Sequence, residues 1–190
     1  DKHNRVEATQ PEIDFCRTNR GIVQIFAEAQ AKGELPQRIT HNDTKIDNVL
    51  LDQNTDEVMC IVDLDTVMPG LIHYDFGDMV RTLTSPADED ERDLDKVTMR
   101  MDFFDALAKG YLSEANDFLS EAEKGYLAQA GKVITFQLGV RFLTDHLNGD
   151  TYFRVHREGQ NLDRARVQFK LVERMLENEE AMKATIAKLG

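Results

Sequence analysis

Residues 39–51 have the sequence ITHNDTKIDNVLL, in which His41, Asp43 and Asn48 form the pattern H-x-D-x-x-x-x-N. Fifteen residues past Asn48, the apolar run Ile61-Val62 ends at Asp63. A carboxylate can accept the proton of an attacking hydroxyl, and an amide oxygen with a second carboxylate can bind Mg²⁺ against phosphates. The stretch therefore carries, on a loop and a following strand, residue types that phosphoryl transfer requires.

The same spacing occurs in phosphoryl-transfer enzymes of the protein-kinase-like fold, whose residue roles are carried over here. We expect Asp43 to be the catalytic base, and Asn48 and Asp63 to bind Mg²⁺ with ATP as co-substrate. A single loop aspartate more often makes an Asx turn. The joint spacing of His41, Asp43, Asn48 and Asp63 favours the site.

Four neighbouring residues have less specific roles. Lys45 either stabilises charge on the transferred phosphoryl group or is a solvated surface lysine. His41 is expected to brace the loop by hydrogen bonding. Asp65 is either a second metal contact or a cap for the turn at Thr66. Asp75, at a helix start, is expected to cap that helix and to bind backbone N–H groups of the loop.

The bulk composition describes a globular domain. The chain has 190 residues, 41% of them hydrophobic, and a formal net charge of −12. Such acidity argues against nucleic acid and anionic membranes as partners. No apolar run has membrane-spanning length. The two cysteines, Cys16 and Cys60, lack metal-site spacing, which fits a reducing, cytoplasmic location.

Hydrophobic periodicity predicts mostly helices. One helix is expected over residues 10–32, with a capping box at Thr9 and an end at Gly33. Further helices are expected from Asp75 to about residue 85, at about 94–112 and 119–147, and after a cap at Asn161 or Asp163. The acidic run 88–93 reads as a solvated loop or helix start. Residues 49–51 and 58–62 form a hairpin, and residues 69–70 form a turn.

The expected fold is α+β, mainly α: a protein-kinase-like C-terminal lobe with helices around a small catalytic β-hairpin. A complete nucleotide site also needs a lobe with a phosphate-covering loop and a strand lysine. About 38 residues precede His41, without a Gly-rich loop. We therefore interpret residues 1–190 as the catalytic, acceptor-binding lobe, whose partner is the N-terminal nucleotide lobe of the same enzyme. The isolated lobe is expected to be inactive.

The catalytic pattern and the later run at residues 74–78, YDFGD, resemble the aminoglycoside phosphotransferase and choline kinase superfamily. Within it, the chain is similar to the N-acetylhexosamine 1-kinases. The similarity lies in TKIDNVL at residues 44–50, IVDLDTVMPG at 61–70 and RFLTDHLNGDTYF at 141–153. This resemblance implies phosphorylation of the anomeric hydroxyl of an N-acetylhexosamine. It also implies that Arg141 and Tyr152 face the sugar.

Arg141 also has a local interpretation. It continues an apolar helix stripe through Leu127 and Ile134, where a guanidinium usually has a partner. Asp145, four residues on, can supply that partner as a helix salt bridge. Alternatively, Arg141 binds sugar oxygens with its forked N–H donors.

Three alternative functions remain to be compared with the sequence. The acceptor could be another small hydroxylated molecule, such as an aminoglycoside or choline. Relatives have also carried the label mucin desulfatase, but Cys16-Arg17-Thr18 lacks the proline of a sulfatase motif. A non-catalytic, kinase-shaped binding module is disfavoured by the presence of Asp43, Asn48 and Asp63. The sequence leaves open the sugar epimer, the nucleotide and the oligomeric state.

Overall fold

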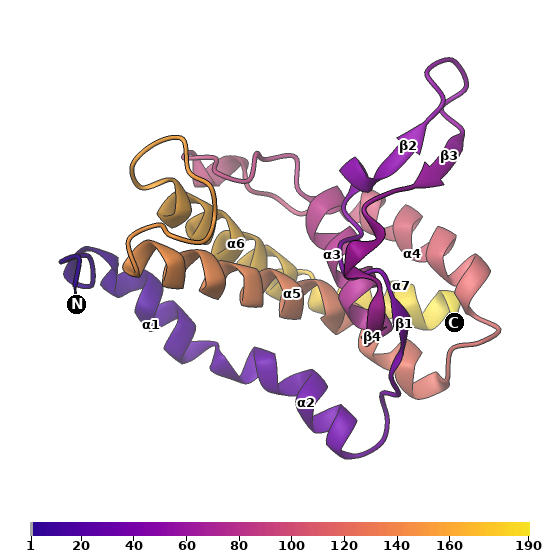
Figure 1. Cartoon of the computed structure of the whole chain (residues 1–190). Coiled ribbons are helices and arrows are strands. Elements are labelled where there is room, and N and C mark those ends of the chain that lie inside the picture. Colours follow the sequence, from indigo (N-terminus) through magenta and orange to yellow (C-terminus); the bar gives the residue numbers. More distant parts are fainter. Residues whose placement is uncertain (1) are drawn as a thin grey trace.

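The computed structural model describes residues 2–190, which form a bundle of helices with two small pairs of strands on one side (Figure 1). The α-helices are α1 (Gln10–Thr18), α2 (Gln24–Ala31), α3 (Ile72–Thr84), α4 (Met101–Ala115), α5 (Glu121–Leu147), α6 (Gln160–Glu177) and α7 (Glu179–Leu189). The strands are β1 (Arg38–Thr40), β2 (Val49–Leu51), β3 (Val58–Ile61) and β4 (Met68–Gly70). The expected mainly helical α+β class is confirmed.

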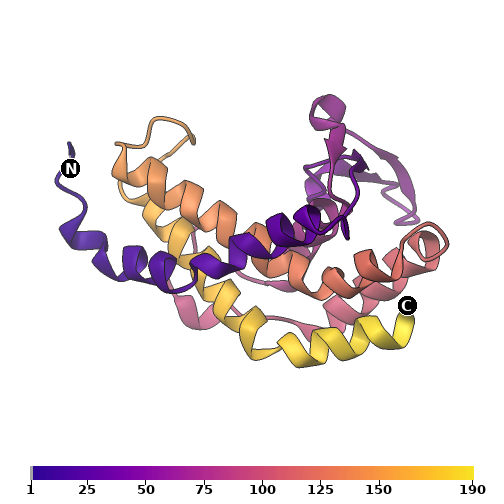
Figure 2. The ribbon, with the colours of Figure 1, turned by 90° about the horizontal axis from the view of Figure 1, so that it is seen from below.

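Helix α5 is the centre of the bundle. It packs most extensively against α6 and α3, and also contacts α7. Figure 2 shows α1 and α2 running along the same bundle, with the strands gathered at one side. Ser120 and Glu123 form a capping box at the start of α5, which the sequence analysis did not predict. No helix of the described residues is long and apolar enough to span a bilayer.

Helices α3 and α5 approach closely because glycines face each other's helix. A Cβ on Gly77 would lie 2.5 Å from the Ala130 carbonyl oxygen, and one on Gly131 would lie 2.6 Å from Val80 Cγ1. Val80, on α3, is fully buried against this contact, and Phe76 is fully buried beside Phe104 and Tyr111 of α4. This tight packing fixes α3. The first turn of α3 holds residues 41–48, the predicted catalytic loop.

The prediction of a single helix over residues 10–32 is wrong, because α1 and α2 are separate helices. Asn19 interrupts it: the Asn19 backbone N–H and side-chain Nδ2 both donate to the Phe15 carbonyl, at 3.0 and 2.9 Å. A side chain that competes for a helix carbonyl favours termination. The Thr9 hydroxyl donates back to the Arg5 carbonyl at 2.9 Å and makes no cap. Gly33 ends α2 in a left-handed conformation, as expected.

The predicted hairpin is present as β2 paired with β3. The turn expected at Pro69-Gly70 is instead strand β4, which pairs antiparallel with β1 so that Ile39 lies opposite Pro69. Proline is tolerated there because each strand of a two-stranded sheet has a free edge. The strand pair β1–β4 closes the base of residues 41–67, which include the loop carrying Asp43 and the hairpin.

The C-terminal region also differs from expectation. Neither Asn161 nor Asp163 caps the last helix, because Gly159 occupies the N-cap of α6 in a left-handed conformation. The expected final helix is two helices, α6 and α7, separated at Asn178. Leu176, near the end of α6, is exposed.

The acidic run 88–93 is a loop, but it is not merely solvated. Its Asp90 accepts hydrogen bonds from Arg157 and Gln160, both at 3.0 Å. Glu89 lies 2.9 Å from Arg164. The run therefore holds the segment before α6 in place.

Candidate active site

The catalytic loop is held by the first turn of α3. Asp75 accepts the backbone N–H groups of His41 and Asn42 through its two carboxylate oxygens, at 2.8 and 2.7 Å. Thr44 Oγ1 donates to the Asp75 carbonyl at 2.7 Å. The N-cap position of α3 is Leu71, so the expected capping role of Asp75 is wrong. Asp75 holds the loop rather than its own helix end.

Asp43, Lys45 and Asn48 form one contact group. Asn48 Nδ2 donates to the Asp43 backbone carbonyl and to Asp43 Oδ2, both at 2.8 Å. Lys45 Nζ lies 3.1 Å from Asp43 Oδ2. Both partners of the Asn48 amide nitrogen are acceptors, which fixes the orientation of the amide. Its Oδ1 receives no hydrogen bond from any described residue and is available to a cation.

The electrostatic setting keeps Asp43 ionised. Partial burial raises the pKa of Asp43. The hydrogen bonds from Lys45 and Asn48 lower this pKa by more than burial raises it, so the resulting pKa is below the ordinary value. The same hydrogen bond raises the pKa of Lys45. A carboxylate with this environment can orient a hydroxyl and accept its proton.

The end of β3 lies beside the loop. The Val62 N–H donates to the Asn48 carbonyl at 2.9 Å, and His41 Nε2 hydrogen-bonds the Val62 carbonyl at 3.1 Å. The next residue, Asp63, has a left-handed conformation, with φ of 63°, and is exposed. A hydrogen bond to Asp65, followed by the repulsion between the two charges, raises the pKa of Asp63. His41 thus joins the loop to the segment carrying both carboxylates.

This donor set fits Mg²⁺. Among residues 2–190, no group of three or more His, Cys, Asp and Glu side chains has the geometry of a metal site. The expected set is smaller: one amide oxygen from Asn48 and a carboxylate from Asp63, with the remaining positions left to water and phosphate oxygens. A bound cation would also offset the crowded charges of Asp63 and Asp65.

A pocket of about 320 Å³ opens beside Asp43. Its walls come from the catalytic loop, α3 and α5: Asn42, Asp43, Tyr74, Asp78, Arg81, Ile134, Gln137, Leu138 and Arg141. Such a volume is at the lower end of the range for small-molecule sites. Ile134 and Leu138 of α5 give the pocket an apolar part, and the polar side chains of α3 and α5 around them suit a small ring that carries hydroxyl groups.

A comparison with protein families agrees with this geometry. The model of the phosphotransferase enzyme family, APH, matches residues 3–120, which is more than half of the chain. The chain belongs to this phosphotransferase family. Its members generally use ATP with Mg²⁺ and act on small molecules. The matched residues include the catalytic loop, β3 and α3.

The segment beyond the family match brings Arg141 and Tyr152 of the phosphotransferase together. Arg141 Nη2 lies 3.4 Å from the Tyr152 hydroxyl, and its guanidinium carbon lies 5.6 Å from the ring centroid. Arg141 also lines the pocket beside Asp43, whereas Tyr152 lines an adjoining one of about 280 Å³. Of the pair, Arg141 is therefore the residue that reaches the pocket of the base.

The expected Arg141–Asp145 salt bridge is absent from the ion pairs of the described residues. Asp145 is buried, and it accepts the backbone N–H groups of Thr151, Tyr152 and Phe153 at 2.8–2.9 Å. Asn161 Nδ2 also donates to it, at 2.9 Å. Asp145 therefore fixes the loop that presents Tyr152 and leaves Arg141 free of a carboxylate.

Sequence reasoning missed Asp78, Arg81 and Gln137. Asp78 lies three residues after Asp75, on the same side of α3. Arg81 lies three residues further and pairs with Asp78 at 2.7 Å. The i, i+3 series of charged residues was a readable signal for a polar helix face. Its position against α5 and the catalytic loop depends on tertiary packing.

Proposed function

We propose that this chain is the catalytic, acceptor-binding lobe of an ATP-dependent sugar kinase that phosphorylates the anomeric hydroxyl of an N-acetylhexosamine. The observation that carries the proposal is the position of Asp43. It contacts Asn48 and Lys45 on one side and lines a ring-sized pocket on the other. The phosphate-binding side and the acceptor side meet at this carboxylate.

Each residue of the group has a role in this proposal. Asp43 orients the acceptor hydroxyl and accepts its proton. Asn48 Oδ1 and Asp63 hold Mg²⁺, which when bound neutralises charge on the nucleotide phosphates. Lys45 places a positive charge within 3.1 Å of the base, where the transferred group must pass. His41 and Asp75 position the loop backbone.

The charge balance of the pocket supports a neutral acceptor. Two of its residues are anionic, Asp43 and Asp78, and two are cationic, Arg81 and Arg141. A polycationic aminoglycoside requires an excess of carboxylates, and choline requires several aromatic faces. Tyr74 is the single aromatic residue that lines this pocket. Hydroxyl and N-acetyl groups instead match alternating donors and acceptors over an apolar wall.

We further propose that the N-terminal nucleotide lobe of the same enzyme covers the strands. Apolar side chains of β2 and β3 are exposed, including Leu50, Val58, Met59 and Ile61. Contiguous exposed apolar side chains mark interaction surfaces. The chain alone is expected to bind Mg·ATP weakly or not at all, because the adenine pocket belongs to both lobes. Micromolar affinity in calorimetry would contradict this.

The decisive test is acceptor profiling of the full-length enzyme. The enzyme is incubated with Mg·ATP and N-acetylglucosamine, N-acetylgalactosamine, kanamycin or choline, and ADP release is followed. We expect turnover with an N-acetylhexosamine and a product whose ³¹P spectrum shows a sugar 1-phosphate. Turnover restricted to kanamycin or choline would overturn the sugar assignment. Absence of transfer to every acceptor would overturn the proposed function.

A further inference from the structure

Asp78 lines the proposed acceptor pocket, and one of its carboxylate oxygens has no partner among the described residues. Asp78 is 8% exposed, and its Oδ1 accepts both Arg81 Nε and Nη2, at 2.9 and 2.7 Å. Its Oδ2 is buried and receives no hydrogen bond from any described residue. Leaving a buried charged acceptor unpaired is unfavourable, because the oxygen has lost its water without gaining a donor. A donor from outside the protein would remove that cost.

The position of Asp78 relates it to the base. Asp75, one helical turn earlier on α3, holds the backbone of the loop that carries Asp43. Asp78 and Asp43 line the same pocket of about 320 Å³. The packing of α3 against α5 at Gly77 limits movement of this turn. One turn of α3 therefore positions both the loop that carries Asp43 and the unpartnered Oδ2 of Asp78.

The chemistry of the oxygen defines its ligand. A carboxylate oxygen accepts hydrogen bonds, so the ligand group must be a donor such as a hydroxyl or an amide N–H. Arg81 offsets the charge of Asp78 through two hydrogen bonds, which removes the advantage of a cationic ligand. A neutral donor on a ring whose reacting hydroxyl faces Asp43 meets both conditions.

We propose that Asp78 Oδ2 accepts a hydrogen bond from a non-reacting hydroxyl or amide N–H of the acceptor sugar and thereby selects that sugar. This inference rests on the proposed function and adds a specificity-determining residue to it. Asp78 binds the ring, Asp43 acts on the anomeric hydroxyl, and Arg81 holds Asp78 in the binding orientation.

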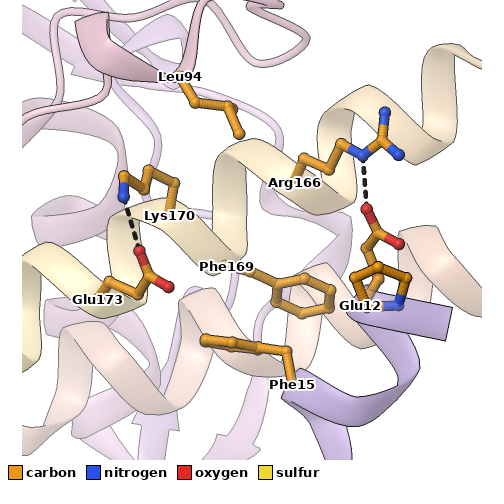
Figure 3. Close-up of a pocket in the computed structure, with 8 residues that line it drawn as sticks. Glu12, Phe15, Leu94, Arg166, Phe169, Lys170 and Glu173 are labelled. Atoms are coloured by element: carbon orange, nitrogen blue, oxygen red, sulfur yellow. Dashed lines mark hydrogen bonds and ion pairs between the residues drawn. The ribbon is translucent and has the colours of Figure 1, made fainter. Parts of the chain in front are cut away.

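A second carboxylate–arginine pair provides a matched control. Glu12, on α1, is also 8% exposed, and its Oε1 accepts Arg166 Nε at 2.6 Å. Its Oε2 is likewise buried without a described partner. Figure 3 shows this pair at the edge of a separate pocket of about 220 Å³, beside Phe15 and Phe169. That pocket contains no residue of the catalytic loop.

The experiment exchanges one oxygen for an N–H₂ group. In Asp78→Asn, the amide oxygen is expected to stay toward Arg81, so that Nδ2 replaces Oδ2 and a donor faces the pocket. In the full-length enzyme, KM for the N-acetylhexosamine should rise roughly ten- to a hundredfold, with a smaller change in kcat. Glu12→Gln changes the same chemistry outside the pocket and should leave kcat and KM unchanged.

Sugar analogues test the contact itself. Among N-acetylhexosamine analogues that each lack one hydroxyl or the amide N–H, one should show a raised KM with the wild-type enzyme. Asp78→Asn should no longer distinguish that analogue from the complete sugar, whereas Glu12→Gln should distinguish it as the wild type does. A merely structural role would lower activity on all analogues in the same ratio.

The outcomes separate the two proposals. A wild-type enzyme that phosphorylates no sugar overturns the proposed function and this inference with it. A sugar kinase whose Asp78→Asn variant keeps the wild-type KM and analogue discrimination overturns the inference alone. Should Asp78→Asn fail to fold, Asp78→Glu keeps the charge for Arg81 while displacing the second oxygen. The same loss of discrimination is then expected, and its absence also overturns the inference.

Discussion

Apolar side chains are buried in the helical bundle, whereas many of those in the strands are exposed. Phe76 and Leu127, in the bundle, are fully buried, whereas Ile39 in β1 and Met59 in β3 are 72% and 69% exposed. All four residues of β3 are exposed, so this strand is buried on neither face. The bundle is a closely packed scaffold that holds residues 41–48 through Asp75 and lines the pocket beside Asp43. The strands flank the loop that carries the predicted base and expose apolar side chains.

The largest expected effect is a loss of chemistry on the strand side without a loss of stability. Asp43→Asn in the full-length enzyme should lower kcat by roughly 10²–10⁴-fold, because it removes the proton acceptor. The free energy of unfolding and the sugar affinity should change little. Asp47→Asn, an exposed acid in the same loop, is the control. Retention of more than half of wild-type kcat would reject Asp43 as the base.

The opposite result is expected in the bundle. Phe76→Ala should lower the free energy of unfolding by about 3–5 kcal/mol, because it leaves a cavity among close-packed rings. The Phe76 ring centroid lies 4.9 Å from that of Tyr111 and 6.3 Å from that of Phe104. Urea unfolding followed by circular dichroism measures the change. A loss below 1 kcal/mol would mean that this interface contributes little to the scaffold.

One ion pair connects the two regions. Arg38 in β1 donates to Glu123 at the start of α5, with distances of 2.6 and 2.9 Å. The Arg38 hydrogen bonds, outweighing burial and aided by Ser120, lower the pKa of Glu123 to about 2. Because the pKa of Glu123 is lower in the folded chain, its ionised carboxylate stabilises the fold at pH values above the ordinary pKa of 4.5. This stabilisation is lost as the pH falls toward about 2.

We therefore expect a contribution on the order of 3 kcal/mol to disappear across that acid range. Urea unfolding of wild type and Glu123→Gln at several pH values measures it. The difference between the two should be large at neutral pH and shrink as the pH falls below 4.5. Two curves that stay parallel would show that Glu123 does not couple β1 to the bundle.

Arg141 tests whether the bundle contributes to acceptor binding. Arg141→Ala should lower kcat/KM for the N-acetylhexosamine roughly ten- to a hundredfold, because hydrogen bonds to the ring are lost. Thermal stability should be retained, since Arg141 is exposed and lacks a carboxylate partner among the described residues. Arg154→Ala, an exposed arginine of the neighbouring loop, is the control. Unchanged activity would leave Arg141 with a structural role against the rings of Tyr152 and Phe153.

The sequence predicted the catalytic loop and the hairpin because their information is local. The H-x-D-x-x-x-x-N spacing and two short apolar runs identify them within about twenty-five residues. The break at Asn19 was missed because periodicity continued through it, while a side-chain hydrogen bond to Phe15 ended the helix. The pairing of β1 with β4 joins residues far apart in sequence and has no local signal.

In the candidate site, too, local sequence signals were read correctly and contacts made by tertiary structure were not. Asp75 was connected to the loop from its place in the sequence, although its capping role was wrong. Asp145 was one of two partners considered for Arg141, because residues four apart on a helix are neighbours. Three backbone N–H groups just beyond the helix end compete for the same carboxylate and bind it instead. A local pairing rule fails where a loop returns to its helix.

The smallest expected effect tests the exposed hairpin directly. Met59→Ser should change the free energy of unfolding of this chain by less than about 0.5 kcal/mol, because the side chain packs against little protein. It should nevertheless weaken association through the uncovered surface. Sedimentation velocity at rising concentration should show self-association of the wild-type chain and less of it for Met59→Ser. Val58→Ser on the opposite face of β3 shows which face associates, since neighbouring residues of a strand point to opposite sides. A wild-type chain that stays monomeric at high concentration, with both variants indistinguishable from it, would count against these strands as a docking surface.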